Sequence, residues 1–221
     1  MNERTQKYLF FGLFLVIGIL ALQVPLTHLA GSKASFTVFD AFAPIAGAFL
    51  GTIPGALAVL LMQVVNFIWH GAHASDVGTF IRLLPAVVAA AYFSRKMPLN
   101  IIIPVFAIIS FIANPVGREV WYFSLFWAIP IACYFYQERF LLARSLGATM
   151  TAHALGGALW IWLVPLPAAV WIGLIPVVIV ERLIFTLGIS AAYVAVNTFF
   201  AYLNKKQSLY VFPVQQKHVL A

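Results

Sequence analysis

Eight polar or charged residues lie within or beside long apolar runs of the 221-residue chain, and they are the candidates for chemistry. Carboxylates could neutralise a cationic group of a small molecule, and arginines could hold a carboxylate or phosphate through two parallel hydrogen bonds. Residues of this kind are costly inside a membrane and are functional candidates by default. The expected substrate contacts are Asp40, Gln63, Asn66, Arg82, Arg118, Glu119, Glu181 and Arg182. The structural alternative is a set of internal salt bridges, for example between Glu181 and Arg82.

The composition predicts that these residues belong to a membrane protein. Hydrophobic residues make up 63% of the chain and charged residues 9%, and the mean hydropathy is +0.99. We therefore expect an all-α fold, a polytopic transmembrane helical bundle surrounded by membrane lipids. The net charge of +7 comes from basic residues at the ends of apolar runs, so it predicts no nucleic acid partner. The single cysteine, Cys133, excludes a disulfide framework.

About eight apolar runs are candidate spans, and six to eight are expected because several are short for a bilayer. They cover residues 8–26, 37–50, 54–69, 77–94, 99–113, 120–136, 146–164 and 168–203. The predicted organisation is an integral membrane helical domain over residues 1–204 and a polar cytoplasmic tail over residues 205–221. The last run is too long for one straight crossing, so we expect it to leave the membrane or to bend at Pro176.

The stretch from residue 37 to residue 69 must break in two. As one helix it would be about 50 Å long, whereas the hydrocarbon core is about 30 Å thick. The break is expected within residues 51–55, because glycine and proline interrupt a helix there most easily. Small residues at four-residue spacing predict close helix packing along this stretch; they are Ala43, Gly47, Gly51 and Gly55.

The basic residues predict the orientation of the chain. With the N-terminus inside, the inner ends of the spans hold nine of the 13 lysines and arginines, and the outer loops hold only Lys33. The predicted location is the cytoplasmic (inner) membrane, with many passes and both termini in the cytoplasm. In this orientation Asp40, Asn66, Arg82 and Glu181 all lie towards the outer side, which predicts a pocket that opens outward.

Two further patterns are hypotheses. Residues 49–57 and 81–92 resemble residues 145–159 and 181–193, which suggests an internal repeat of four spans plus four. Most tryptophans lie at predicted outer ends, where an aromatic belt is expected and where one or two could stack on a planar ligand. These tryptophans are Trp69, Trp121, Trp160, Trp162 and Trp171.

No sequence motif predicts catalysis, a metal or a cofactor. His70 and His73 fall in a predicted outer loop, whereas His153 lies near the inner end of its span. A shared metal site is therefore not expected. The sequence has no His-Glu-x-x-His motif, no Gly-x-Ser-x-Gly elbow and no phosphate-binding glycine loop with lysine. We therefore expect a protein that is not an enzyme, with no catalytic residue, no metal, no cofactor and no ATP hydrolysis of its own.

Residues 39–96 resemble part of the S components, the substrate-binding membrane subunits of energy-coupling factor (ECF) transporters. In that family a short span with an acidic or polar start leads through a Gly-x-x-x-Gly turn into a second span with a polar end. The similar features here are Asp40, the turn 51–55 and Asn66, followed by residues 81–85 and 94–96. S components usually have six spans. The resemblance implies transport of a vitamin-like or other small organic molecule from outside, with a separate coupling transmembrane subunit and ATPases as partners.

Other functions stay open on the sequence alone. One is a small intramembrane hydrolase or transferase that acts on lipid through Glu119, Glu181 or His153. Another is a membrane assembly or structural subunit whose small-residue ladders pack against partner proteins. A third is haem or metal binding through histidine. The sequence does not identify the solute.

Overall fold

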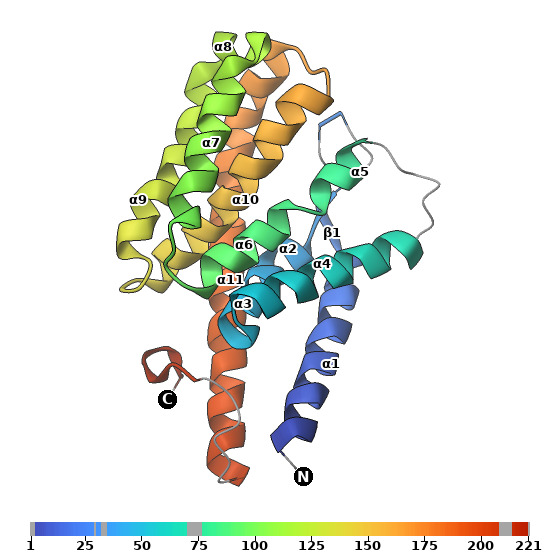
Figure 1. Ribbon diagram of the computed structural model, residues 1–221, viewed down its shortest axis with the longest axis vertical. Helices are drawn as coiled ribbons and strands as arrows, with labels where there is room; N and C mark the ends of the chain where they lie inside the picture. Colours follow the sequence, from blue (N-terminus) through green and yellow to red (C-terminus); the bar gives the residue numbers. More distant parts are fainter. Residues whose placement is uncertain (1–2, 29, 32–34, 70–76, 208–213, 221) are drawn as a thin grey trace.

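The structure is a computed structural model of the chain, and it describes residues 3–28, 30–31, 35–69, 77–207 and 214–220. It is predominantly helical (Figure 1). Within these residues, three helical stretches are long and apolar enough to cross a membrane, and four shorter apolar helices accompany them. The long stretches are Thr52–Trp69, Val77–Ser94 and Ala168–Lys205. The apolar helices indicate a membrane protein, in agreement with the predicted all-α class.

The N-terminal part contains a β-hairpin that the sequence does not predict. Helix α1 (Glu3–Leu22) is followed by strand β1 (Pro25–His28), which pairs antiparallel with strand β2 (Ser35–Thr37). The predicted span 8–26 is wrong in this respect, because α1 ends at Leu22 and β1 begins at Pro25. Strands this short carry too few residues to show an alternating pattern.

The stretch 37–69 breaks where the sequence predicts. Its first part consists of helix α2 (Val38–Phe42), the 3-10 turn η1 (Ala43–Ile45) and helix α3 (Ala46–Leu50), and its second part is helix α4 (Thr52–Trp69). Gly51 separates the two parts with a φ of +92°, a conformation that glycine adopts without strain. The predicted break within residues 51–55 is confirmed.

The predicted span 77–94 is divided into helix α5 (Val77–Arg82) and helix α6 (Pro85–Ser94). Pro85 starts α6, a position where its missing N–H interrupts no helical hydrogen bond. The break frees the backbone carbonyl of Leu83, which accepts a hydrogen bond at 2.9 Å from Nε2 of Gln63 on α4. Helix α5 ends at Arg82, and this residue lines the cavity described below.

Small residues allow α3, α4 and α6 to approach closely. Ala43 is fully buried. A Cβ atom at Gly47 would overlap the backbone carbonyl oxygen of Ala90 on α6. A Cβ atom at Gly55 would lie 2.7 Å from the carbonyl oxygen of Ala46. Gly51, the remaining member of the predicted ladder, forms the turn instead.

The second half of the chain packs around helix α10 (Leu141–Leu163). Helices α7 (Leu99–Ala113), α9 (Ala128–Tyr136) and α11 (Ala168–Gln207) contact α10, and Figure 1 shows them running alongside it. Helix α8 (Pro115–Glu119) and the 3-10 helix η3 (Trp121–Trp127) connect α7 to α9. Helix α7 has the predicted bounds, whereas the predicted span 120–136 begins as a 3-10 helix.

The described part of the tail, residues 214–220 with the 3-10 turn η4 (Gln216–His218), contacts α11. Asn197 of α11 is fully buried; its Nδ2 donates to the backbone carbonyl of Gln215 at 2.9 Å, and its Oδ1 accepts from the Gln215 N–H at 3.0 Å. Lys217 Nζ donates to the carbonyl of Glu138 at 2.8 Å. The tail is therefore attached to the helical domain. The polar loop with His70 and His73 lies outside the described residues.

Two apolar clusters form the interior. The first joins α2, α3, α4 and α6 and includes Phe39 and Met62. The second joins α7, η3, α10 and α11 and includes Phe111 and Trp127. The residues that line the candidate site come from both clusters, so the site lies where the two halves of the molecule meet.

Candidate functional site

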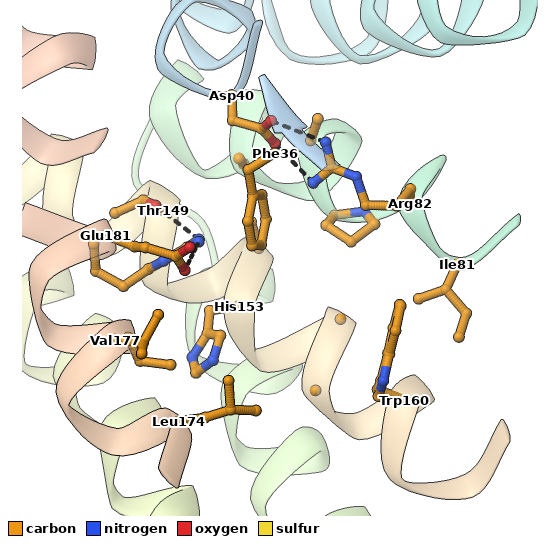
Figure 2. Close-up of a pocket in the computed structure, with 18 of the residues that line it drawn as sticks. Phe36, Asp40, Ile81, Arg82, Thr149, His153, Trp160, Leu174, Val177 and Glu181 are labelled. Carbon is orange, nitrogen blue, oxygen red and sulfur yellow. Dashed lines mark hydrogen bonds and ion pairs between the residues drawn. The ribbon is translucent and has the colours of Figure 1, made fainter. Parts of the chain in front are cut away.

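A cavity of about 120 Å³ lies between the two apolar clusters. Its walls come from the β1–β2 hairpin and from α2, α5, α6, η3, α10 and α11. Most of the lining is apolar or aromatic, but Figure 2 shows several polar side chains at one part of it. The polar lining includes Asp40, Arg82, Thr149, His153, Glu181 and Arg182.

The first ion pair joins α2 to α5. Asp40 lies in the first turn of α2, and its Oδ2 accepts a hydrogen bond at 2.8 Å from the backbone N–H of Thr37, which positions the carboxylate at the start of the helix. Arg82 donates from Nη1 to Oδ1 at 3.1 Å and from Nη2 to Oδ2 at 2.9 Å (Figure 2). The side chains of Arg82 and Asp40 are only 12% and 13% exposed. The two groups therefore form a bidentate pair with no net charge.

The second ion pair lies on α11 and is more deeply buried. Arg182 is 4% exposed and Glu181 is 9% exposed. Arg182 Nη1 donates to Thr149 Oγ1 on α10 at 3.2 Å, and Nη2 lies 3.5 Å from Glu181 Oε2. The other oxygen of Glu181 accepts from the Thr27 hydroxyl of β1 at 2.5 Å. The example pair Glu181 and Arg82 is not formed, but internal salt bridges are present with other partners: Arg82 pairs with Asp40, and Arg182 pairs with Glu181.

Phe36 separates the two arginines. It belongs to β2, and its ring lies in the cavity wall (Figure 2). The guanidinium carbon of Arg82 and that of Arg182 each lie 4.6 Å from the centroid of this ring. Two positively charged groups thus share one aromatic ring, an arrangement that cation–π attraction favours. The hairpin therefore takes part in both charged pairs, through Phe36 and through Thr27.

His153 is held in one tautomer by Trp127. It lies four residues after Thr149 on α10, so both side chains occupy the same face of the helix. Its Nδ1 accepts a hydrogen bond at 3.1 Å from Nε1 of Trp127. Because an indole N–H can only donate, Nδ1 carries no proton, and Nε2 is the protonated nitrogen of a neutral ring. His153 therefore brings a hydrogen-bond donor to a site that it lines.

Aromatic side chains and unpaired donors complete the site. Trp160, Trp171 and Phe123 line the cavity, and the Phe123 and Trp171 rings meet edge to face at 5.1 Å. Among the described residues, two buried donors of the lining have no hydrogen-bond partner, Nε of Arg182 and Nε1 of Trp171. The arrangement suits the binding of a molecule that has flat faces and hydrogen-bond acceptors.

The structure brings four of the eight predicted contact residues together, and the other four lie elsewhere. Gln63 and Asn66 on α4 make hydrogen bonds to neighbouring segments. Gln63 Nε2 donates to the backbone carbonyl of Leu83 at the α5–α6 break, and Asn66 Oδ1 accepts from Gln23 Nε2 at 2.7 Å. Both amides are therefore directed to neighbouring segments of α4, and neither lines the cavity.

Arg118 and Glu119 are exposed residues of α8, which Figure 1 shows at one end of the molecule. The first turn of α8 is fixed by Asn114, whose Oδ1 accepts from the N–H groups of Val116 and Gly117. In this short helix the buried residue is Gly117, so the two charged side chains face outward. The sequence places Arg118 and Glu119 correctly near a helix end, but it cannot show which face of the short helix α8 is exposed.

Several lining residues escape sequence reasoning. Phe36 lies beside a predicted apolar run and Thr149 lies within one, and only the tertiary structure brings them to the charged pairs. Trp160 and Trp171 are two of the tryptophans for which ligand stacking was considered, whereas Trp121 and Trp162 are each 52% exposed. On the sequence alone His153 is a candidate for metal binding or catalysis, and in the structure it accepts a hydrogen bond from Trp127.

Comparison with known proteins shows a distant similarity. No family model matches the chain, and no solved structure matches it. The chain is similar to an uncharacterized protein of Methanocaldococcus jannaschii, with 27% identity over 205 residues that cover 83% of this chain and 69% of that protein. The description of this relative names no activity.

Proposed function

We propose that the protein is a membrane subunit that binds a small organic solute in the cavity between α2, α5, α10 and α11. The observation that carries this proposal is the pair of buried arginine–carboxylate contacts on the wall of a cavity inside an apolar helical protein. Burying four charged groups in such surroundings is costly, and the cost is understandable when the groups shape a binding site.

The orientation and cellular role form part of the same proposal. The amino end of α1 and the carboxyl end of α11 lie at the same end of the molecule (Figure 1), as expected if both termini are in the cytoplasm. We assign the apolar runs to eight membrane segments, some of them too short to cross fully, in the cytoplasmic membrane. The solute would enter from outside.

The partners follow from the resemblance to S components. Under this proposal a separate coupling subunit and ATPases drive uptake, and this chain supplies the solute site. The prediction is that cells accumulate the solute only when this chain is expressed together with such subunits. Uptake by this chain alone, at the same rate and against a gradient, would contradict the requirement for partners.

The binding step has a direct test on the purified full-length protein. We expect a small molecule to co-purify and to be released on denaturation, where mass spectrometry identifies it. Its affinity for Arg82→Ala and Glu181→Ala should fall at least about tenfold, because each substitution disrupts one of the charged pairs.

Matched controls for this test lie on α8. Arg118→Ala and Glu119→Ala remove the same two charge types from exposed positions outside the cavity, and they should leave affinity unchanged. Thermal unfolding of each variant checks that it is folded. Equal affinity of Arg82→Ala, Glu181→Ala and the wild type would remove this cavity as the binding site.

A further inference from the structure

We infer that the cavity takes a flat, single-ring molecule that carries hydrogen-bond acceptors at its edge and no net positive charge. This inference rests on the proposed function and specifies the class of solute. Three features of the lining support it: the state of the carboxylates, the donors that remain, and the size and aromatic character of the walls.

The carboxylates leave no site for a cation. Both oxygens of Asp40 accept from Arg82, and one of them also accepts from Thr37. One oxygen of Glu181 accepts from Thr27, and the other faces Arg182. All four carboxylate oxygens are engaged. An ammonium group in the cavity would therefore meet two guanidinium groups without a free anionic partner.

The lining also holds hydrogen-bond donors without a partner. Nε of Arg182 and Nε1 of Trp171 have no partner among the described residues, but both atoms are buried beneath the cavity surface, so a ligand meets them only after a small shift of these side chains. The neutral ring of His153 adds Nε2–H, because its Nδ1 is occupied by Trp127. Donors that are cut off from water need acceptors. Carbonyl, carboxylate or ring-nitrogen atoms of a ligand are acceptors of this kind.

The size and walls of the cavity favour one ring. A cavity of about 150 Å³ with apolar walls accommodates benzene, so the volume of about 120 Å³ here limits the enclosed part of a ligand to no more than one ring. Its lining includes the aromatic residues Phe36, Phe123, Trp160 and Trp171. Aromatic walls stabilise a flat ring by offset or edge-to-face contacts. A single aromatic ring with an acceptor substituent combines these requirements.

The test measures binding of four simple probes to the purified full-length protein by tryptophan fluorescence and calorimetry. Benzamide and benzoate have one ring and an acceptor group, benzylamine has the same ring and a positive charge, and cyclohexanecarboxylate has the acceptor without an aromatic ring. We expect benzamide or benzoate to bind at least about tenfold more tightly than benzylamine and than cyclohexanecarboxylate. Preference for benzylamine, or equal binding of benzoate and cyclohexanecarboxylate, would overturn the inference.

Trp171→Phe tests the role of the unpaired indole donor. It keeps an aromatic ring and removes Nε1–H, so benzamide affinity should fall about fivefold, the effect of one neutral hydrogen bond. Trp121→Phe is the matched control, because Trp121 is 52% exposed and lies outside the cavity. Equal affinities of the two variants would contradict the proposed contact.

The co-purified molecule separates failure of this inference from failure of the proposed function. A bound solute that is cationic, or that lacks a ring, would overturn the ligand class and leave solute binding intact. A bound single-ring acceptor would support the class even if all four probes were too weak to detect. No co-purified molecule and no probe binding would contradict both.

Discussion

Arg82, the last residue of α5, meets Asp40 of α2 through two parallel hydrogen bonds of 3.1 and 2.9 Å. The two residues lie 42 positions apart in the chain, so their pair fixes the position of the α5 end relative to the start of α2. Because the same arginine also lies against Phe36, the pair connects two helices and the hairpin at the wall of the cavity.

A double-mutant cycle measures this connection. Asp40→Asn and Arg82→Gln each leave one largely buried charge without its partner, which we expect to cost about 3 kcal/mol, or about 6–12 °C in unfolding temperature. The double variant should lose much less than the sum. Arg118→Gln and Glu119→Gln, at exposed positions, are the control pair. Additive losses in the Asp40 and Arg82 cycle would show that the two residues are not coupled.

Phe36→Leu tests the ring between the two guanidinium groups. The substitution keeps an apolar side chain but removes both cation–π contacts, each of about 0.5–2 kcal/mol. We expect a lower unfolding temperature and weaker solute binding. Phe36→Tyr, which keeps the aromatic faces, should retain most of both. Phe199→Leu changes an aromatic residue that is 51% exposed and should have little effect; a similar loss there would contradict a specific role for Phe36.

Gly47→Ala tests the close approach of α3 and α6. The added Cβ would overlap the carbonyl oxygen of Ala90, and because backbone cannot move aside easily, we expect a loss of about 1–3 kcal/mol in folding free energy. The control is Gly173→Ala, where a Cβ would meet nothing within 4 Å and helix propensity should improve slightly. Unfolding temperatures of the two variants should change in opposite directions. Similar values for both would contradict the packing argument.

Trp127→Phe tests what holds His153 in its tautomer. In the wild type, ¹⁵N NMR of the histidine side chains should show His153 protonated at Nε2, because Nδ1 accepts from Trp127. Without the indole donor we expect a signal from the Nδ1-protonated form as well. Trp162→Phe removes an indole that bonds Ser110 instead, so it should leave the spectrum of His153 unchanged. A single Nε2-protonated signal in Trp127→Phe would contradict this account.

His218 predicts a pH dependence for the attachment of the tail. Partial burial lowers the pKa of His218 below its ordinary value, and the nearby charges of Lys217 and Arg144 lower it further. The attached state thus disfavours the protonated ring, so attachment should be weaker as the pH falls below about 6.5. Amide hydrogen exchange of residues 214–220, corrected for intrinsic rates, should be faster at about pH 5.5 than at about pH 7.5.

The control for this effect is His218→Gln, which removes the titrating group. In this variant the corrected exchange rates should be the same at both pH values. A pH dependence that persists in His218→Gln would assign the effect to another group.

The elements that the sequence predicts well are those with a local cause. The break at Gly51 follows from backbone freedom, and the bounds of α7 follow from a continuous apolar run closed by Asn114 and Pro115. The hairpin and the 3-10 helix η3 are missed, because short strands and tight helical turns leave no distinct hydrophobic period.

The candidate site shows the same division. Asp40, Arg82, Glu181 and Arg182 stand out because charge in an apolar run is conspicuous, and the structure brings all four to the cavity. Their pairing could not be predicted, because it depends on which helices pack together. Phe36 could not be predicted either, because an aromatic residue beside an apolar run gives no sign that two guanidinium groups will lie against it.

Helix α11 has 40 residues and is about 60 Å long. Even when it leans by about 40°, it needs only about 40 Å to cross a hydrocarbon core of about 30 Å. If α11 crosses the membrane as proposed, about 20 Å of the helix lies outside the hydrocarbon core. Helix α11 holds both Arg182 at the cavity and Asn197 at the attached tail. The two residues lie about 22 Å apart along the helix axis, and the sequence between them contains no proline. The helix therefore connects the attached tail to the cavity wall without a proline break.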